Sequence, residues 1–127
     1  MTMAGAAFPT LDAPGVRIKT RLEGEVLKVD MSGTVETREP GLTFDPYWND
    51  VDESVRREGV RHVELDIRGV DFMNSSGILT LVRWMIKVKQ DPAYEIVIRH
   101  DRDLTWQKSS VPVLAKLAPA SVRVAEL

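Results

Sequence analysis

Hydrophobic and polar residues follow the two-residue period of a β-strand in two early segments, 16–22 and 25–32. Glu23 and Gly24 separate these segments and suit a tight turn, so the pair is predicted to form an antiparallel hairpin. Three further strands are predicted over 60–67, 94–99 and 121–125. In the middle one, the run Ile96-Val97-Ile98 is typical of a strand that is buried on both faces.

Longer segments between these strands carry apolar residues at helical spacing. The first predicted helix begins at Asp45, a good capping residue, and ends at Gly59. A second helix is predicted over 75–90. The segment 103–117 predicts two helical pieces, because Pro112 is tolerated best in the first turn of a new helix.

The predicted order is therefore two strands followed by three helix–strand units. Units of this kind favour right-handed crossovers and parallel neighbouring strands. The fold class is α/β, with one mixed sheet, an N-terminal antiparallel hairpin and helices packed on the sheet. A chain of 127 residues suits one domain, predicted over 16–127, after a flexible leader over 1–15.

Composition narrows the class of function. Seventeen Lys and Arg against nineteen Asp and Glu give a net charge of −2, which offers no general attraction to nucleic acid. No segment approaches the roughly 20 apolar residues that span a bilayer, so we expect a soluble, cytoplasmic domain without membrane insertion. The chain lacks cysteine, a Gly-x-Ser-x-Gly elbow and a phosphate-binding glycine loop, and His62 and His100 have no third ligand nearby. We therefore expect no metal, no cofactor and no enzymatic activity.

The most informative stretch is Val70-Asp-Phe-Met-Asn-Ser-Ser-Gly-Ile78, which joins a predicted strand to the second helix. Ser75 or Ser76 is predicted to cap the free backbone N–H groups of that helix. The helix N-terminus favours negative charge, so a phosphate on Ser75 would bring roughly −1.5 to −2 charges to a position that stabilises them. Taken alone, these residues are also explained by a purely structural cap.

The same stretch resembles the signature of STAS domains, the bacterial anti-sigma factor antagonists. Their usual form is apolar-x-Phe-apolar-Asp-Ser-Ser-Gly-apolar, after a strand with a pattern such as Leu65-Asp66-Ile67. In this divergent member Asn74 stands where the family has Asp, followed by Ser76 and Gly77 within the motif. The resemblance implies that Ser75 is phosphorylated by a GHKL-type serine kinase, often itself the anti-sigma factor, and reset by a PPM-type phosphatase.

A partner surface is predicted on the second helix, which is apolar over about 220° at 100° per residue. Helices that cover both shoulders would explain this width, as would a partner that covers one of them. The candidates for an exposed shoulder are Leu79 and Ile86, with Arg83 beside them, or Trp84 and Val88 on the other side. The Leu79 side is favoured because it lies one turn from Ser75.

Two classes of function remain open at this point. The first is a regulatory protein-binding module that is switched by phosphorylation of Ser75. The second is a constitutive scaffold or complex subunit, or a small-ligand or transporter-accessory STAS module, in which the Ser-Ser-Gly is only a helix cap.

Overall fold

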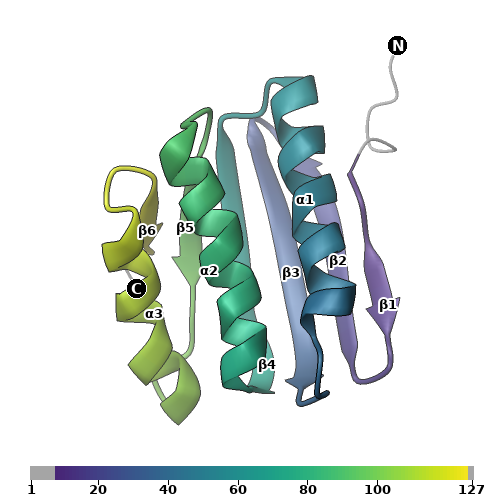
Figure 1. Cartoon of the computed structure of the whole chain (residues 1–127). Coiled ribbons are helices and arrows are strands. Elements are labelled where there is room, and N and C mark those ends of the chain that lie inside the picture. Colours follow the sequence, from purple (N-terminus) through teal and green to yellow (C-terminus); the bar gives the residue numbers. More distant parts are fainter. Residues whose placement is uncertain (1–7, 126–127) are drawn as a thin grey trace.

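The computed structural model describes residues 8–125, which form a six-stranded sheet with helices on one face (Figure 1). The strands lie in chain order across the sheet, from β1 at one edge to β6 at the other. In chain order the elements are β1 Leu11–Ala13, β2 Val16–Glu23, β3 Val26–Val35, α1 Gly41–Glu58, β4 His62–Met73, α2 Ser75–Gln90, β5 Glu95–Arg99, α3 Thr105–Leu117 and β6 Val122–Val124.

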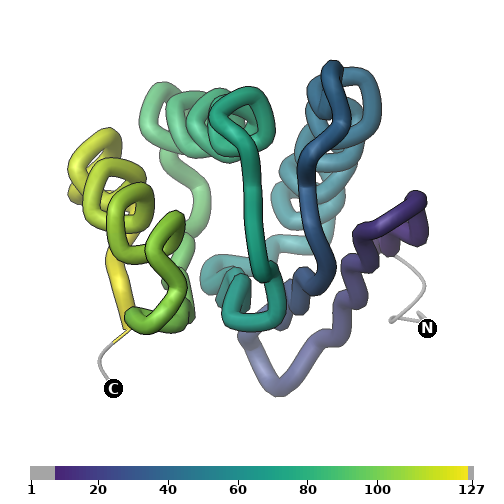
Figure 2. The backbone as a smooth tube through the Cα atoms, turned by 90° about the horizontal axis from the view of Figure 1, so that it is seen from below, coloured from purple at the N-terminus to yellow at the C-terminus, as the bar shows by residue number. Residues whose placement is uncertain are grey.

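The sheet is mixed, as predicted. Strands β1, β2 and β3 pair antiparallel, whereas β3, β4, β5 and β6 pair parallel. Each helix connects two neighbouring parallel strands, and α1, α2 and α3 all lie on the same face of the sheet (Figure 2). The α/β class and the antiparallel start of the sheet are thereby confirmed. Within residues 8–125 the other face of the sheet has no covering helix.

The core lies between the sheet and the three helices. Inward side chains alternate along the strands and are almost fully buried: Leu27, Val29 and Met31 on β3, Val63, Leu65 and Ile67 on β4, and Ile96 and Ile98 on β5. Trp48 of α1 stacks on Trp84 of α2, with ring centroids 4.5 Å apart. This aromatic contact and the packing around it hold α1 and α2 side by side.

The uncovered face is polar and laced with ion pairs. Glu64 on β4 accepts a hydrogen bond from Lys28 at 2.6 Å and pairs with Arg99 at 3.0 Å. Burial acts to raise the pKa of Glu64, but the hydrogen bonds from these two cations outweigh it and the pKa is lowered. Val97 lies on this face and is only half-buried, so the prediction that its strand is buried on both faces is wrong.

The start of the domain differs from the prediction. Residues 11–13 form β1, at the edge of the sheet, where a flexible leader was expected. Phe8 is buried, and the Tyr47 hydroxyl donates a hydrogen bond to the Pro9 carbonyl at 2.9 Å, which holds this segment against α1. The remaining residues of the predicted leader, 1–7, lie outside the described part of the chain.

Helix α1 begins at Gly41, not at Asp45. Pro40 has helical backbone angles, and its carbonyl accepts a hydrogen bond from Phe44 N–H at 2.8 Å, which starts the helix one turn early. Asp45 makes no cap and instead pairs with Arg83 of α2. The predicted end at Gly59 is confirmed, with φ of 71° in the left-handed region that favours glycine.

Strand β4 is longer than the strand predicted over 60–67, because the residues that follow continue the pairing with β3 up to Met73. The extension contains register shifts: Asp30 lies opposite Asp66, but Ser32 lies opposite Gly69. Helix α3 is also continuous rather than two pieces. It tolerates Pro112 in its interior on the exposed side.

Candidate functional site

The predicted site lies at the edge of the molecule where the parallel strands end and the helices begin (Figure 1). Ser75 is the first residue of α2 and follows β4 after the single residue Asn74. Figure 2 looks onto this edge, where the β3–α1 loop lies beside the β4–α2 connection. Edges of this kind, at the carboxyl ends of parallel strands, are where α/β sheets commonly bind their ligands.

Asn74, not a serine, caps α2. Its side-chain Oδ1 accepts a hydrogen bond from Gly77 N–H at 2.8 Å, and its backbone is extended, as an N-cap requires. The prediction that Ser75 or Ser76 is the cap is therefore wrong. Both serines lie inside the helix, one and two positions after the cap. Asn and Ser are similarly favoured at the N-cap, so residue type alone did not distinguish Asn74 from the two serines that follow it.

Asn74 also bonds to the loop between β3 and α1. Its side-chain Nδ2 donates a hydrogen bond to the Thr37 carbonyl at 2.9 Å, and its backbone N–H donates to the Val35 carbonyl at 2.9 Å. The start of α2 is thus bound to the end of β3 and to the loop that follows. No sequence pattern indicated this link, because Thr37 is distant along the chain.

Gly77 has no room for a side chain. A Cβ at this position would lie 2.8 Å from both Met73 Cγ and Val35 Cγ1, and 3.2 Å from Asn74 Oδ1. The glycine of the motif therefore lets the first turn of α2 pack directly onto the ends of β3 and β4.

The two serines are left exposed and uncommitted. Ser75 and Ser76 are both exposed, and neither side chain makes a hydrogen bond with any described residue. The Ser75 hydroxyl is thus accessible at a helix N-terminus, where the free N–H groups and the helix dipole favour an anion.

The structure distinguishes the two predicted shoulders of α2. Leu79 is 50% exposed and Ile86 is 37% exposed, whereas Trp84 and Val88 are buried against the core. On a helical wheel Leu79 and Ile86 lie within about 40° of Ser75, so the exposed apolar residues share its side of the helix. The width of the apolar arc therefore has two causes: a buried face and an exposed apolar stripe.

Arg83 connects this stripe to α1. Its guanidinium pairs with the Asp45 carboxylate through two hydrogen bonds, of 3.1 and 2.9 Å. One turn further along both helices, Lys87 donates to the Asn49 side chain at 3.2 Å. Successive turns of the two helices therefore lie opposite each other, with Asp45 opposite Arg83 and Asn49 opposite Lys87.

The same register, continued one turn toward the helix starts, brings Gly41 of α1 to the level of Leu79, so Leu42 lies one residue further along α1, at the level of Thr80. Leu42 is 75% exposed, the highest value among the large apolar side chains described. We call Ser75, Leu79 and Ile86 of α2, with Leu42 of α1, the Ser75 surface. The sequence did not indicate Leu42, because it precedes Asp45, where the first helix was predicted to begin.

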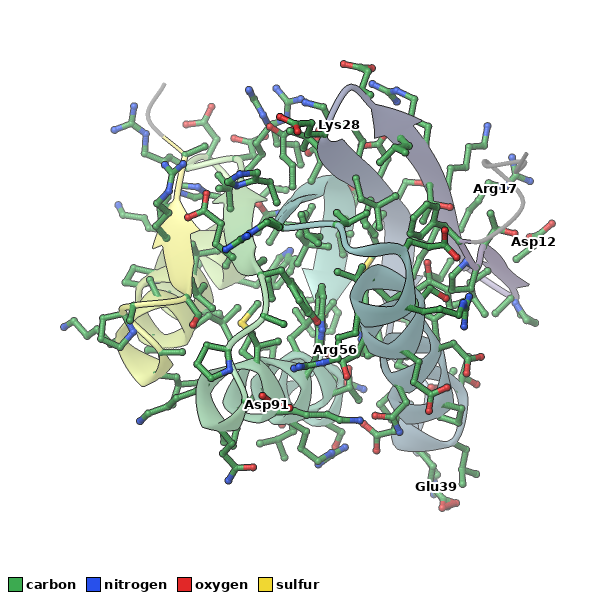
Figure 3. All side chains as sticks on the ribbon, turned by 90° about the horizontal axis from the view of Figure 1, so that it is seen from above. Asp12, Arg17, Lys28, Glu39, Arg56 and Asp91 are labelled. Carbon is green, nitrogen blue, oxygen red and sulfur yellow. The ribbon has the colours of Figure 1, made fainter. Side chains whose placement is uncertain are left out.

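A polar cluster toward the ends of α1 and α2 links these helices to Tyr94, the residue before β5. The Asp52 carboxylate accepts hydrogen bonds from the Tyr94 hydroxyl at 2.7 Å and from Arg56 Nε at 3.0 Å. Trp84 Nε1 donates to the same Tyr94 oxygen at 2.8 Å, and burial raises the pKa of that phenol. Arg56 also reaches Asp91 at 3.2 Å, across the gap between α1 and the end of α2 (Figure 3).

Gln107 ties α3 to the irregular part of β4. It is fully buried, and its Nε2 donates to the carbonyls of Ile67 at 2.7 Å and Val70 at 2.9 Å. Its Oε1 accepts a hydrogen bond from Asp101 N–H at 2.7 Å. Two carbonyls of β4 near its register shifts thus accept hydrogen bonds from a buried side chain. These bonds fix the part of the strand that leads to Ser75.

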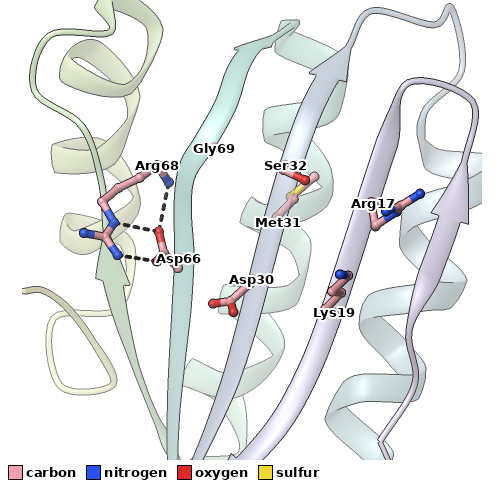
Figure 4. A pocket seen from close by; sticks show the side chains of 8 residues that line it. All are labelled: Arg17, Lys19, Asp30, Met31, Ser32, Asp66, Arg68 and Gly69. Atoms are coloured by element: carbon pink, nitrogen blue, oxygen red, sulfur yellow. Dashed lines mark hydrogen bonds and ion pairs between the residues drawn. The ribbon is translucent and has the colours of Figure 1, made fainter.

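The uncovered face of the sheet has a shallow hollow of about 590 Å3, lined mainly by charged and small residues of β2, β3 and β4 (Figure 4). Asp66 closes part of it by pairing with Arg68 on its own strand at 2.7 Å. Burial acts to raise the pKa of Asp66, but the hydrogen bonds from Arg68 outweigh it and the pKa is lowered. The hollow lies on the face opposite the helices, away from the Ser75 surface.

Residues 8–125 contain neither a cluster suited to a metal ion nor a helix suited to crossing a membrane. These residues bring together no group of three His, Cys, Asp or Glu side chains that would hold a metal ion. None of the helices in this part of the chain has the length and apolar character that crossing a membrane requires. His62 instead pairs with Glu95 at 3.1 Å on the sheet surface.

No family model and no curated protein matches the sequence. The structure is similar to the crystal structure of an anti-sigma factor antagonist from Mycobacterium paratuberculosis, with a TM-score of 0.64 over 92% of each chain. The two sequences are 17% identical, so the likeness is one of fold. The chain shares the fold of this anti-sigma factor antagonist, as the motif resemblance implied.

Proposed function

We propose that the protein is a non-enzymatic regulatory module, acting in the bacterial cytoplasm, that binds a partner protein through the Ser75 surface. Phosphorylation of Ser75 switches this binding. The proposed partner is a GHKL-type serine kinase of the anti-sigma factor class, and a PPM-type phosphatase restores the free hydroxyl.

The observation that carries this proposal is an exposed, uncommitted Ser75 beside exposed apolar side chains. Leu42 and Leu79 place apolar area on the surface of a chain whose other large side chains mostly lie in the core. A serine hydroxyl fits at the margin of such an apolar contact. A phosphate brings roughly −1.5 to −2 charges to the same place, and its desolvation opposes the contact.

The alternative is a constitutive scaffold in which the serines only cap a helix, and the observed cap does not support it. Asn74 already supplies the cap, through its bond to Gly77 N–H. A cap therefore does not account for the two serines. The Mycobacterium protein of the same fold is by its description an anti-sigma factor antagonist, which favours a regulatory role.

The experiment begins with capture of the partner from an extract of the native host, using Ser75→Ala as bait. The captured protein is then purified and titrated by calorimetry against the wild type, Ser75→Asp and Leu79→Asp. Both variants are expected to bind at least about tenfold more weakly, which corresponds to ~1.4 kcal/mol.

The matched control is Ser109→Asp, the same change at an exposed serine on α3. It is expected to bind like the wild type, and circular dichroism checks that every variant folds. If Ser75→Asp and Leu79→Asp also bind like the wild type, the Ser75 surface is not the interface. If Leu79→Asp unfolds the protein, Leu42→Asp tests the same surface from α1.

A further inference from the structure

The two side-chain hydrogen bonds of Asn74 have opposite polarity. Gly77 N–H is only a donor, so the atom that faces it at 2.8 Å is the oxygen Oδ1. The Thr37 carbonyl is only an acceptor, so the atom that faces it at 2.9 Å is the nitrogen Nδ2. The orientation of the amide is therefore determined by its partners. An ionised aspartate makes the first bond but not the second.

The second bond reaches a loop that belongs to the proposed interface. Residues 36–39 follow β3 and are all exposed, and the chain then turns into α1, where Leu42 is 75% exposed. Among the side chains of residues 8–125, that of Asn74 is the one that bonds this loop to the start of α2.

We propose that Asn74 is a positioning residue whose side-chain amide holds the 36–40 loop against the start of α2. Ser75, the loop and Leu42 thereby form one preformed surface. The carboxamide, in place of the aspartate found in the STAS signature, is what makes this link possible. The consequence for partner binding rests on the proposed function, whereas the tether is a property of the free protein.

The test separates the tether from the cap. Asn74→Asp keeps the oxygen that caps Gly77 and removes the donor, whereas Asn74→Ser keeps a capping oxygen, removes the donor and adds no charge. Thr37→Ala is the matched control, because it changes the side chain and leaves the bonded carbonyl in place. Amide hydrogen exchange of the free protein is measured for residues 36–43 and for the first turns of α2.

Both Asn74 variants are expected to speed exchange in the 36–43 segment by about tenfold or more, with the protection of α2 retained. In the wild type, a through-hydrogen-bond NMR coupling is expected between Asn74 Nδ2 and the Thr37 carbonyl carbon. Thr37→Ala is expected to leave both results unchanged. Unchanged exchange in the segment for both Asn74 variants overturns the tether, as does loss of loop and helix protection together.

Titration against the captured partner completes the test. Asn74→Asp and Asn74→Ser are both expected to weaken binding by about threefold or more, mainly through slower association with a less ordered surface. If exchange changes but binding does not, the tether exists and its role in docking is refuted. If Ser75→Asp also binds like the wild type, the proposed function fails instead, and the exchange result still decides the tether.

Discussion

Replacing Gly77 with alanine tests the packing that positions Ser75. The added methyl group would lie 2.8 Å from Met73 Cγ and from Val35 Cγ1, closer than carbon atoms pack. Met73 and Val35 are 3% and 1% exposed, so neither has open space to move into. Val35 is also β-branched and paired within the sheet, which restricts its rotamers.

The expected magnitude is a balance of three effects. Overpacking of a filled site costs about 1–3 kcal/mol. The new methyl also crowds Asn74 Oδ1 at 3.2 Å, which weakens a cap worth ~1 kcal/mol. Alanine returns up to ~1 kcal/mol through its higher helix propensity. We therefore expect Gly77→Ala to lower the free energy of unfolding by roughly 1–3 kcal/mol.

Gly41→Ala is the matched control, in the first turn of the parallel helix α1. Its methyl group would meet the ends of the Asp45 and Arg83 side chains, at 3.0 and 3.4 Å, and both are flexible enough to shift. This variant is expected to be as stable as the wild type or up to ~1 kcal/mol more stable. Urea denaturation of both variants provides the comparison. A Gly77→Ala protein as stable as Gly41→Ala would refute the close packing at the motif.

Three further predictions concern the core, the helix cap and the Glu64 ion pair. Leu65→Ala removes a fully buried side chain and is expected to cost about 2–5 kcal/mol in urea denaturation, so a loss below about 1 kcal/mol would contradict its burial. In the same urea denaturation, Asn74→Ala is expected to lower the free energy of unfolding by about 1 kcal/mol, and alanine at Ser75 or Ser76 by less than about 0.5 kcal/mol. The reverse order would place the cap on a serine. Folding lowers the pKa of Glu64 below its ordinary value of about 4.5, so its ionised form stabilises the folded protein. This stabilisation is expected to be complete above pH ~4.5 and to be lost as the pH falls through the lowered pKa. Glu64→Gln is expected to flatten the acid limb of a stability–pH profile, and an unaltered limb would exclude this ion pair as its cause.

Much of the fold was predictable because its signals are local. The bounds of α2, the hairpin around Gly24 and the end of α1 at Gly59 follow from periodicity and from glycine conformations, which neighbouring residues determine. The same local rules misplaced the start of α1, because Asp45 looks like a cap but is used in an ion pair with Arg83. Choosing between those two uses requires knowledge of which helix lies beside α1.

The candidate site was predictable in part for the same reason. The motif located Ser75 and the start of α2, and the helical wheel located Leu79 and Ile86, since each of these depends on one segment. The cap, the Thr37 tether and the exposed Leu42 depend on residues far apart in the chain that the fold brings together. Gln107 belongs to the same class, because a buried glutamine is explained only by the strand carbonyls that face it.

The measurement that tests the central claim most directly is site-resolved mass spectrometry of the protein purified from its native host. We expect a fraction of the molecules to carry one phosphate, located on Ser75 by peptide fragmentation. This phosphate is expected to disappear in Ser75→Ala and to persist in Ser76→Ala and Ser109→Ala. Phosphate located on another residue, or none under any growth condition in which the proposed kinase is present, would contradict the account.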